Sequence, residues 1–344
     1  MNDVLPCSTP SQVLDIGLFH PEDAPSLLKL YQNPNSGLPS QGSLNSIEKI
    51  IEHFHSPDIY LVLARSSEGE ILGYIDLFHI NVKAGSLFIN MGFVLPNHRA
   101  QNIGNQLMNY VINVLAVDLK VEHVSGDILC HHTHMQKLII NFQGKIRGYD
   151  IALAVDAYNP QSPGKQARTS ALIMGGTFIT RPQTLYLPDI YKKDLLNMYD
   201  AWHCWHRFLS SDSNLPVETQ TTGRLNMITS FHLARIIIYK IGSDFATFFR
   251  EMEEKIKLNQ NITVIQVYLP LTTPFSGGAV DILRSKAYFL GGPIPRWYNP
   301  RNDALLMQKM NCEPNFAGIK VFSEHAHMIL DIVKKDWEQR QKEK

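Results

Sequence analysis

The chain has 344 residues, of which 44% are hydrophobic and 19% are charged, so it can bury sizeable cores and is not disordered. Its length favours two domains over one. The 32 lysines and arginines equal the 32 aspartates and glutamates, so the formal net charge is zero. This balance lacks the basic excess of a nucleic-acid-binding protein, and we expect no nucleic-acid partner.

The cysteines and the apolar segments indicate the compartment. Four cysteines, Cys7, Cys130, Cys204 and Cys312, are far apart and lack CxxC spacing, which is typical of a reducing compartment without a disulfide framework. We find neither a signal-peptide pattern nor an apolar run of about 18 residues that could span a membrane. We therefore expect a cytoplasmic protein with no membrane partner. A bacterial effector delivered into a host by a dedicated machine would look the same.

In chain order, the first half begins with a polar stretch of about 15 residues that we expect to be loose, and then alternates helical and strand patterns. Two helices precede three strands, and the turn at residues 66–70 suits an antiparallel hairpin. The predicted elements are helices at 19–31 and 46–55, strands at 59–65, 71–79 and 86–95, a helix from Ile103, a strand at 121–130, a helix at 133–143, and strands at 149–156 and 168–179.

The most informative segment is the strand, turn and helix at residues 86–116. The predicted helix places its apolar residues on one face, as expected for a helix that packs on a sheet: Ile103, Leu107, Met108, Val111, Ile112 and Leu115. The loop before it presents backbone N–H groups and the positive end of the helix dipole, which suit a phosphate. Gly104 permits a close approach and Arg99 can neutralise charge. An ordinary strand–turn–helix is the alternative.

This segment resembles a known cofactor loop. The run Val94-x-Pro96-x-x-Arg99-x-Gln101-x-Ile103-Gly104-x-x-Leu107 is similar to the pyrophosphate loop of the GNAT acyltransferase superfamily, roughly V-x-P-x-x-R-G-x-G-x-G-x-x-L. Ala100 and Asn102 replace two of the family glycines, although Asn tolerates positive φ better than most residues. The order of predicted elements at about 20–180 is also similar. The resemblance implies acetyl-CoA as cosubstrate, bound by Phe93, Val94, Leu95, Arg99, Ala100, Gln101, Asn102, Ile103, Gly104 and Asn105.

The second half repeats part of this order after a Pro/Gly-rich break at residues 159–168. We predict a helix at 188–209, strands at 232–241, 262–270, 287–296 and 303–310, and helices at 244–258 and 277–286. The expected fold is α/β (α+β), with a mixed, mostly antiparallel GNAT-type sheet and flanking helices. The expected domains are a GNAT domain at 15–180, a helical linker at 181–221 and a degenerate GNAT-like domain at 222–344 without the pyrophosphate loop. An unrelated α+β domain is the alternative for the last.

The residues that relatives often use for catalysis are missing. Asn90 and Met91 stand where a Glu base is common, and Ile140 stands where a Tyr acid is common. His132 and His134 are the substitute candidates, because a histidine with a near-neutral pKa can act as base or acid. Two other readings stay open for this cluster. The histidines could have a structural role, and a metal could be bound by Cys130, His131, His132 and His134, although we expect no metal.

The sequence thus predicts an acetyl-CoA-dependent N-acyltransferase that acts on an unidentified amine of a small molecule or a protein. Backbone amides of residues 102–105, with Arg99, would hold the pyrophosphate, and the edge of residues 93–95 would pair with the pantetheine arm. The missing base and acid favour catalysis by positioning. The alternatives are a silent acyl-CoA-binding sensor and an interaction scaffold. A monomer is mildly favoured.

Overall fold

The structure is a computed structural model and describes residues 14–36, 38, 43–81, 85–142, 150–158, 169–200, 205–299 and 301–343. The chain divides into two compact units. Unit 1 comprises Met1–His79 and Leu87–Val121, and unit 2 comprises Ile80–Ser86 and Glu122–Lys344. Within the described part of the chain, no helix is both long and apolar enough to cross a membrane.

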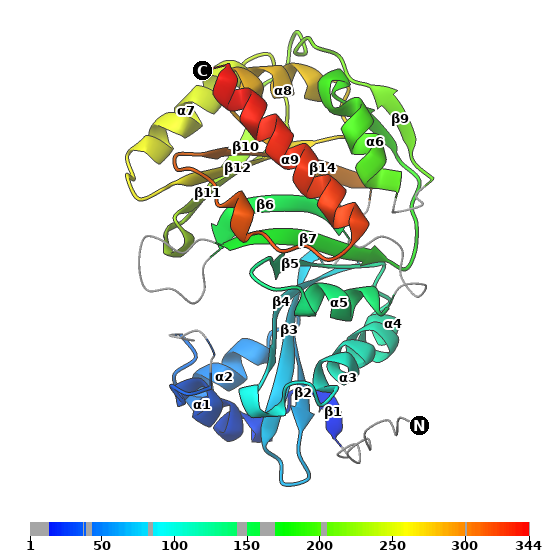
Figure 1. Cartoon of the computed structure of the whole chain (residues 1–344), viewed down its shortest axis with the longest axis vertical. Coiled ribbons are helices and arrows are strands. Elements are labelled where there is room, and N and C mark those ends of the chain that lie inside the picture. Colours follow the sequence, from blue (N-terminus) through cyan, green and yellow to red (C-terminus); the bar gives the residue numbers. More distant parts are fainter. Residues whose placement is uncertain are drawn as a thin grey trace, which may run out of the picture. The chain divides into compact units, whose positions relative to one another are not determined.

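Unit 1 is built on strands in the order β1-β2-β3-β4, with helices on both sides of the strands (Figure 1). Its strands are β1 (Asp15–Leu18), β2 (Ile59–Arg65), β3 (Ile71–Asn81) and β4 (Ser86–Val94), of which β3 and β4 extend into unit 2 at their joining ends. Its helical elements are η1 (Pro21–Asp23), α1 (Ala24–Gln32), α2 (Ile47–Phe54), η3 (Pro96–His98), α3 (Ile103–Tyr110), the π-helical turn η4 (Val111–Leu115) and α4 (Ala116–Asp118). β2 pairs antiparallel with both β1 and β3.

The core of unit 1 lies on both faces of these strands because their apolar residues alternate. One face carries Leu61, Leu63 and Tyr74, which form a cluster with residues of α1 and α2. The apolar face predicted for the helix at 103–116 is confirmed, since its residues are all buried: Ile103, Leu107, Met108, Val111, Ile112 and Leu115. The packing of this stripe fixes the start of α3 beside the end of β4.

Unit 2 contains the rest of the described elements (Figure 1). Its strands are β5 (His123–Leu129), β6 (Asp150–Tyr158), β7 (Thr169–Thr177), β8 (Thr184–Leu187), β9 (Arg207–Ser210), β10 (Thr222–Ile228), β11 (Leu233–Lys240), β12 (Val264–Pro270), β13 (Phe289–Asn299) and β14 (Asn302–Met310). Its helical elements are α5 (His134–Ile140), η5 (Asp189–Tyr191), α6 (Lys192–Asp200), η6 (Thr229–Phe231), α7 (Phe245–Lys257), α8 (Ser276–Ser285), η7 (Phe316–Gly318) and α9 (Glu324–Lys342).

Two sets of strands in unit 2 have the same arrangement. The antiparallel order β5-β7-β6 corresponds to the antiparallel order β12-β14-β13, and each set places a helix between its first and second strands in the sequence. The second set continues through β11, which is parallel to β12 and connected to it by α7, to the antiparallel strand β10. Parallel neighbours need such a crossover, and here the helix supplies it.

The structure confirms the predicted fold class, a mixed α/β architecture with mostly antiparallel strands. Between residues 181 and 221 we expected a helical linker with a helix at 188–209. The structure instead has the shorter helix α6 between two short strands, β8 and β9. β8 and β9 pair in parallel, and all of these elements belong to unit 2. The Pro/Gly-rich break at 159–168 and the segment 201–204, which includes Cys204, lie outside the described residues, as do residues 1–13 with Cys7.

Candidate functional site

The loop between β4 and α3 belongs to unit 1 and begins with the one-turn helix η3. Leu95, the residue before η3, donates its backbone N–H to the backbone carbonyl of Leu72 on β3 at 2.9 Å. The Arg99 side chain is exposed and donates from Nε to the Val94 carbonyl at 3.3 Å, so it folds back over the end of β4. Gln101 donates to the carbonyl of Asn97 at 3.3 Å. These bonds shape the loop from within and leave a cation at its surface.

Two residues of this loop have a left-handed backbone. Ala100 has φ 64° and Asn102 has φ 63°, and both are exposed. This conformation favours glycine, because a Cβ crowds the following carbonyl and costs about 1–2 kcal/mol. They are two of the three positions at which the GNAT pattern has glycine, and the third is Gly104. The loop therefore keeps a glycine-like backbone after both glycines have been replaced, and Asn102 gains a bond from Asn105 Nδ2 at 2.7 Å.

The first turn of α3 follows directly. Asn102 is its N-cap residue, and no side chain caps the first turn of this helix within the described residues. The leading N–H groups of a helix have no partner inside the helix, so they attract an anion. Gly104 is the second residue of α3 and is half-buried.

Not all ten predicted cofactor-binding residues offer a side chain to a ligand. Phe93 and Ile103 are buried with 9% and 2% exposure, and Phe93 belongs to the core cluster that contains Tyr74. These two residues can contribute only backbone groups. The side chains of Arg99, Gln101 and Asn102 are at the surface. The ten residues thus lie at the end of β4, in the loop and at the start of α3. Some of them can offer only backbone groups to a ligand, and others can also offer a side chain.

The position of the missing Glu base is occupied by Asn90 on β4, which contacts a carboxylate that the sequence reasoning missed. Asn90 donates from Nδ2 to Oδ2 of Asp76 on β3 at 2.6 Å. Burial raises the pKa of the Asp76 carboxyl, and the Asn90 bond and the charge of His53 oppose this only in part. Strand alternation could have found it, because Asp76 follows Tyr74 by two residues and so shares its face.

Two tyrosines lie close enough to this carboxylate for its charge to affect their pKa values. Tyr31 on α1 and Tyr74 on β3 meet edge to face with ring centroids 6.3 Å apart, and the Tyr74 hydroxyl contacts Met91 Sδ at 3.3 Å. Burial and the Asp76 charge both raise the pKa of each tyrosine, so both hydroxyls stay protonated near neutral pH. Asp76, Tyr31 and Tyr74 all belong to unit 1, as does the loop.

The histidine cluster lies in unit 2, at the start of α5. The rings of His131 and His132 are 4.1 Å apart, and those of His132 and His134 are 5.1 Å apart. Burial and the nearby charge of Lys320 lower the pKa of His131. Among the described residues there is no group of three or more His, Cys, Asp or Glu side chains that could hold a metal ion. Cys130 is buried, and its thiol donates to the Ile128 carbonyl at 3.6 Å.

The residues beside these histidines have a structural task. Gln136 is completely buried, donates to the Lys320 carbonyl at 2.8 Å and accepts from the Phe322 N–H at 2.9 Å. Lys137 lies over the Phe322 ring, 5.0 Å from its centroid. The first turn of α5 therefore anchors the segment that leads into α9.

Unit 2 contains a second strand, loop and helix, formed by β11, residues 241–244 and α7. Here the chain itself covers the loop. A Cβ on Gly242 would lie 2.3 Å from the backbone N of Thr221, and Thr221 donates that N–H to Asp244 Oδ1 at 2.7 Å. Asp244 is the N-cap residue of α7, and the Thr221 bond lowers its pKa. A carboxylate and residues 219–221 thus occupy the place at which a phosphate would approach.

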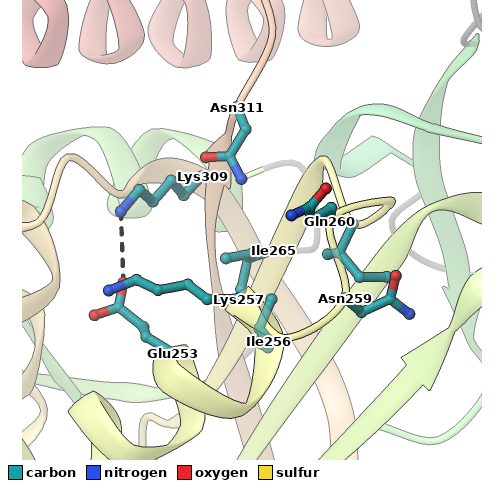
Figure 2. Close-up of a pocket in the computed structure, with 9 residues that line it drawn as sticks. Glu253, Ile256, Lys257, Asn259, Gln260, Ile265, Lys309 and Asn311 are labelled. Carbon is teal, nitrogen blue, oxygen red and sulfur yellow. Dashed lines mark hydrogen bonds and ion pairs between the residues drawn. The ribbon is translucent and has the colours of Figure 1, made fainter.

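A hollow of about 300 Å³ is present near the end of α7 (Figure 2). Its charged side chains are paired. Glu253 accepts from Lys286 at 2.8 Å and lies 3.5 Å from Lys309, whereas Lys257 pairs with Glu254 at 2.8 Å. The hollow has no group with the geometry of a reactive site, and we treat it as a surface depression.

No curated protein matches the chain. Among solved structures, the spermidine N-acetyltransferase from Vibrio cholerae in complex with CoA and spermine is 13% identical, with 47% of this chain and 94% of that chain covered and a TM-score of 0.40. A dodecameric structure of this enzyme in an intermediate state is 13% identical, with 48% and 94% covered and a TM-score of 0.39.

A family model gives the assignment. It is the model of the acetyltransferase (GNAT) family, and it matches residues 25–134, which include the loop and the whole of α3. The resemblance predicted from the loop is confirmed over this stretch. Residues 25–134 of the chain are therefore similar to the acetyltransferase (GNAT) family.

Proposed function

We propose that the chain is an acetyl-CoA-dependent N-acetyltransferase whose acceptor is a small-molecule amine. The observation that carries the proposal is the loop of residues 95–102, where Ala100 and Asn102 hold the left-handed conformations that the GNAT pattern assigns to glycine. Left-handed residues other than glycine cost folding free energy and are common at functional sites, so two of them within three positions of this loop support a ligand-binding role. The family match over residues 25–134 supports the same reaction.

In this proposal the pyrophosphate of acetyl-CoA lies against the N-terminus of α3. The N–H groups of residues 102–105 donate to the phosphate oxygens, and Arg99 swings from Val94 to neutralise their charge. The pantetheine arm pairs with the backbone of residues 93–95 as an added strand would. The loop then fixes the thioester in place, and much of the rate enhancement comes from positioning.

The proposal extends to the domain organisation. Residues 15–180 form the GNAT domain, residues 181–221 connect it to the rest, and residues 222–344 form a degenerate GNAT-like domain. Two observations support the last assignment: the order β12-β14-β13 is the same as β5-β7-β6, and the loop at 241–244 is covered by residues 219–221. Such a domain binds no acetyl-CoA of its own.

Calorimetric titration with acetyl-CoA, followed by a thiol-release assay with primary amines, tests the function. We expect one binding site per chain and amine-dependent release of CoA. Absence of binding would contradict the proposal. Binding without release on any amine would indicate a silent acyl-CoA sensor.

The role of His132 and His134 in catalysis or acceptor binding stays a prediction. Single variants His132→Ala and His134→Ala, assayed by thiol release, decide it. Loss of kcat in one of them with unchanged thermal stability is the expected result if a histidine takes part. If both variants turn over normally, the structural reading of the cluster holds.

A further inference from the structure

The carboxylate of Asp76 has the surroundings of a binding group. It is half-buried on β3, and within the described residues its recorded hydrogen bond is the one that Oδ2 accepts from Asn90. No lysine or arginine forms an ion pair with it in the described part of the chain. A half-buried carboxylate without a cationic partner is costly, and such groups are common at functional sites.

The groups that interact with Asp76, Asn90 by a hydrogen bond and the others through charge, come from four elements. Tyr31 lies on α1, His53 on α2, Tyr74 on β3 and Asn90 on β4. His53 is the one residue among them that can carry a positive charge, and it is exposed. The hydroxyls of the two tyrosines ionise only at high pH. These residues therefore present apolar ring faces and protonated hydroxyls. This combination of a carboxylate and aromatic rings suits a cationic amine.

We propose that Asp76 is the catalytic base of this protein, binding the ammonium group of a primary amine acceptor and accepting its proton, with Asn90 as the positioning residue. The inference rests on the proposed function, because it assumes that acetyl-CoA is held by the loop of the same unit. Asn90 fixes Oδ2 and leaves Oδ1 to receive the ammonium. The base is thereby supplied by the strand next to the one on which the family often places it.

The proton and electron balance of the step is complete. Asp76 takes one proton from the ammonium, and the neutral nitrogen uses its freed electron pair to form a C–N bond with the thioester carbonyl carbon. The C–S bond then breaks, and its electron pair leaves on the sulfur of CoA. The second proton of the nitrogen passes to this thiolate through water and yields CoA and the amide. Asp76 releases its proton to solvent.

A pH dependence follows from the raised pKa of Asp76. The carboxylate must be charged to act as base, so kcat/KM should rise as pH increases through this pKa. Stability should change in the opposite direction. Because the folded state holds this proton more tightly than the unfolded state, the charged carboxylate destabilises the fold as pH rises above the unfolded value. Asp76→Asn should remove both effects.

The experiment compares the full-length wild-type chain with Asp76→Asn and with Asp58→Asn, an exposed aspartate of the same unit. Each protein is titrated with acetyl-CoA, melted at several pH values, and assayed by thiol release with butylamine, 1,4-diaminobutane and tyramine. For Asp76→Asn we expect unchanged acetyl-CoA affinity, a melting temperature above the wild type at pH 8 that converges near pH 4, and a kcat at least about 100-fold lower. Asp58→Asn should behave as the wild type.

The outcomes separate this inference from the proposed function. If the wild type does not bind acetyl-CoA, the proposed function fails and the inference fails with it. If acetyl-CoA binds but no amine of the panel is acetylated, the assignment of Asp76 to a primary amine is overturned while the cofactor site stands. If Asp76→Asn keeps kcat within about threefold, or loses stability and acetyl-CoA affinity together, Asp76 is not the base.

Discussion

The chain contains two strand–loop–helix segments that invite comparison, β4 with α3 and β11 with α7. In the first, residues 95–102 form a loop in which Ala100 and Asn102 are exposed and have positive φ. In the second, residues 241–244 form a short loop that residues 219–221 cover, with Asp244 at the helix N-terminus. The start of α3 is thus open, whereas residues 219–221 and the Asp244 carboxylate cover the loop before α7.

With the degenerate domain proposed above, the comparison describes a loop that has lost its ligand while the surrounding fold is kept. β11 and β12 are paired in parallel from Leu233 to Ile237. Phe245 and Phe249 of α7 are buried in the core. The Asp244 carboxylate accepts the Thr221 N–H and lies at the positive end of α7, where negative charge is favoured as a phosphate would be, although its side chain does not bond to the first N–H groups of the helix. The packing of the segment is therefore independent of its ability to bind a phosphate.

The largest predicted effect concerns residues 241–244, the closed loop. Gly242→Ala should lower the free energy of unfolding by about 2 kcal/mol, because its Cβ would meet the backbone of residues 219–221. The measurement is thermal denaturation. Ser243→Ala, which loses only the hydroxyl bond to the Thr219 carbonyl, should cost much less. Acetyl-CoA affinity should be unchanged in both, and a tenfold loss of affinity in Gly242→Ala would contradict the comparison.

The next effect concerns residues 95–102, the open loop. Arg99→Ala should weaken acetyl-CoA binding about tenfold, or 1.4 kcal/mol, since the guanidinium loses its charge-assisted bonds to phosphate. Calorimetry at two salt concentrations checks it, and the difference should shrink at high salt. His98→Ala in the same loop is the control and should bind within about threefold of the wild type. Equal affinities of Arg99→Ala and the wild type would exclude Arg99 from the site.

The smallest effect tests the backbone of the open loop. Ala100→Gly should stabilise the chain by about 0.5–1 kcal/mol, because glycine adopts φ 64° without a steric penalty. Asn102→Gly should gain less, since it also loses the bond from Asn105. Denaturation midpoints measure both. A destabilised Ala100→Gly variant would show that this residue does not have the left-handed conformation.

The strand–loop–helix of unit 1 could be predicted because its signals are local. The helical period of Ile103 to Leu115 marks the buried face, and the motif around Arg99 marks the loop. The short parallel strands β8 and β9 could not, since each has four residues and depends on a partner far along the chain. Short strands take their stability from pairing more than from their own sequence.

The candidate site was predicted only in part, for a similar reason. The substitution at Asn90 was visible in the sequence, but its hydrogen bond to Asp76 depends on the register between β3 and β4. Sequence spacing instead drew attention to His132 and His134, which are neighbours along the chain and belong to unit 2. Strand alternation places Asp76 on the face of Tyr74, but its contact with Asn90 becomes visible only when the two strands are placed side by side.

The most direct test of the account uses equivalent positions of the two segments. Gly104 and Ala246 are the second residues of α3 and α7, and each can be replaced by glutamate. Titration of the two variants with acetyl-CoA should show one site per chain in Ala246→Glu, with wild-type affinity. Gly104→Glu should bind at least about 30-fold more weakly, because the new charge repels the pyrophosphate at the helix N-terminus. Equal binding by both variants, or loss of binding in Ala246→Glu alone, would contradict the assignment of the acetyl-CoA site to unit 1.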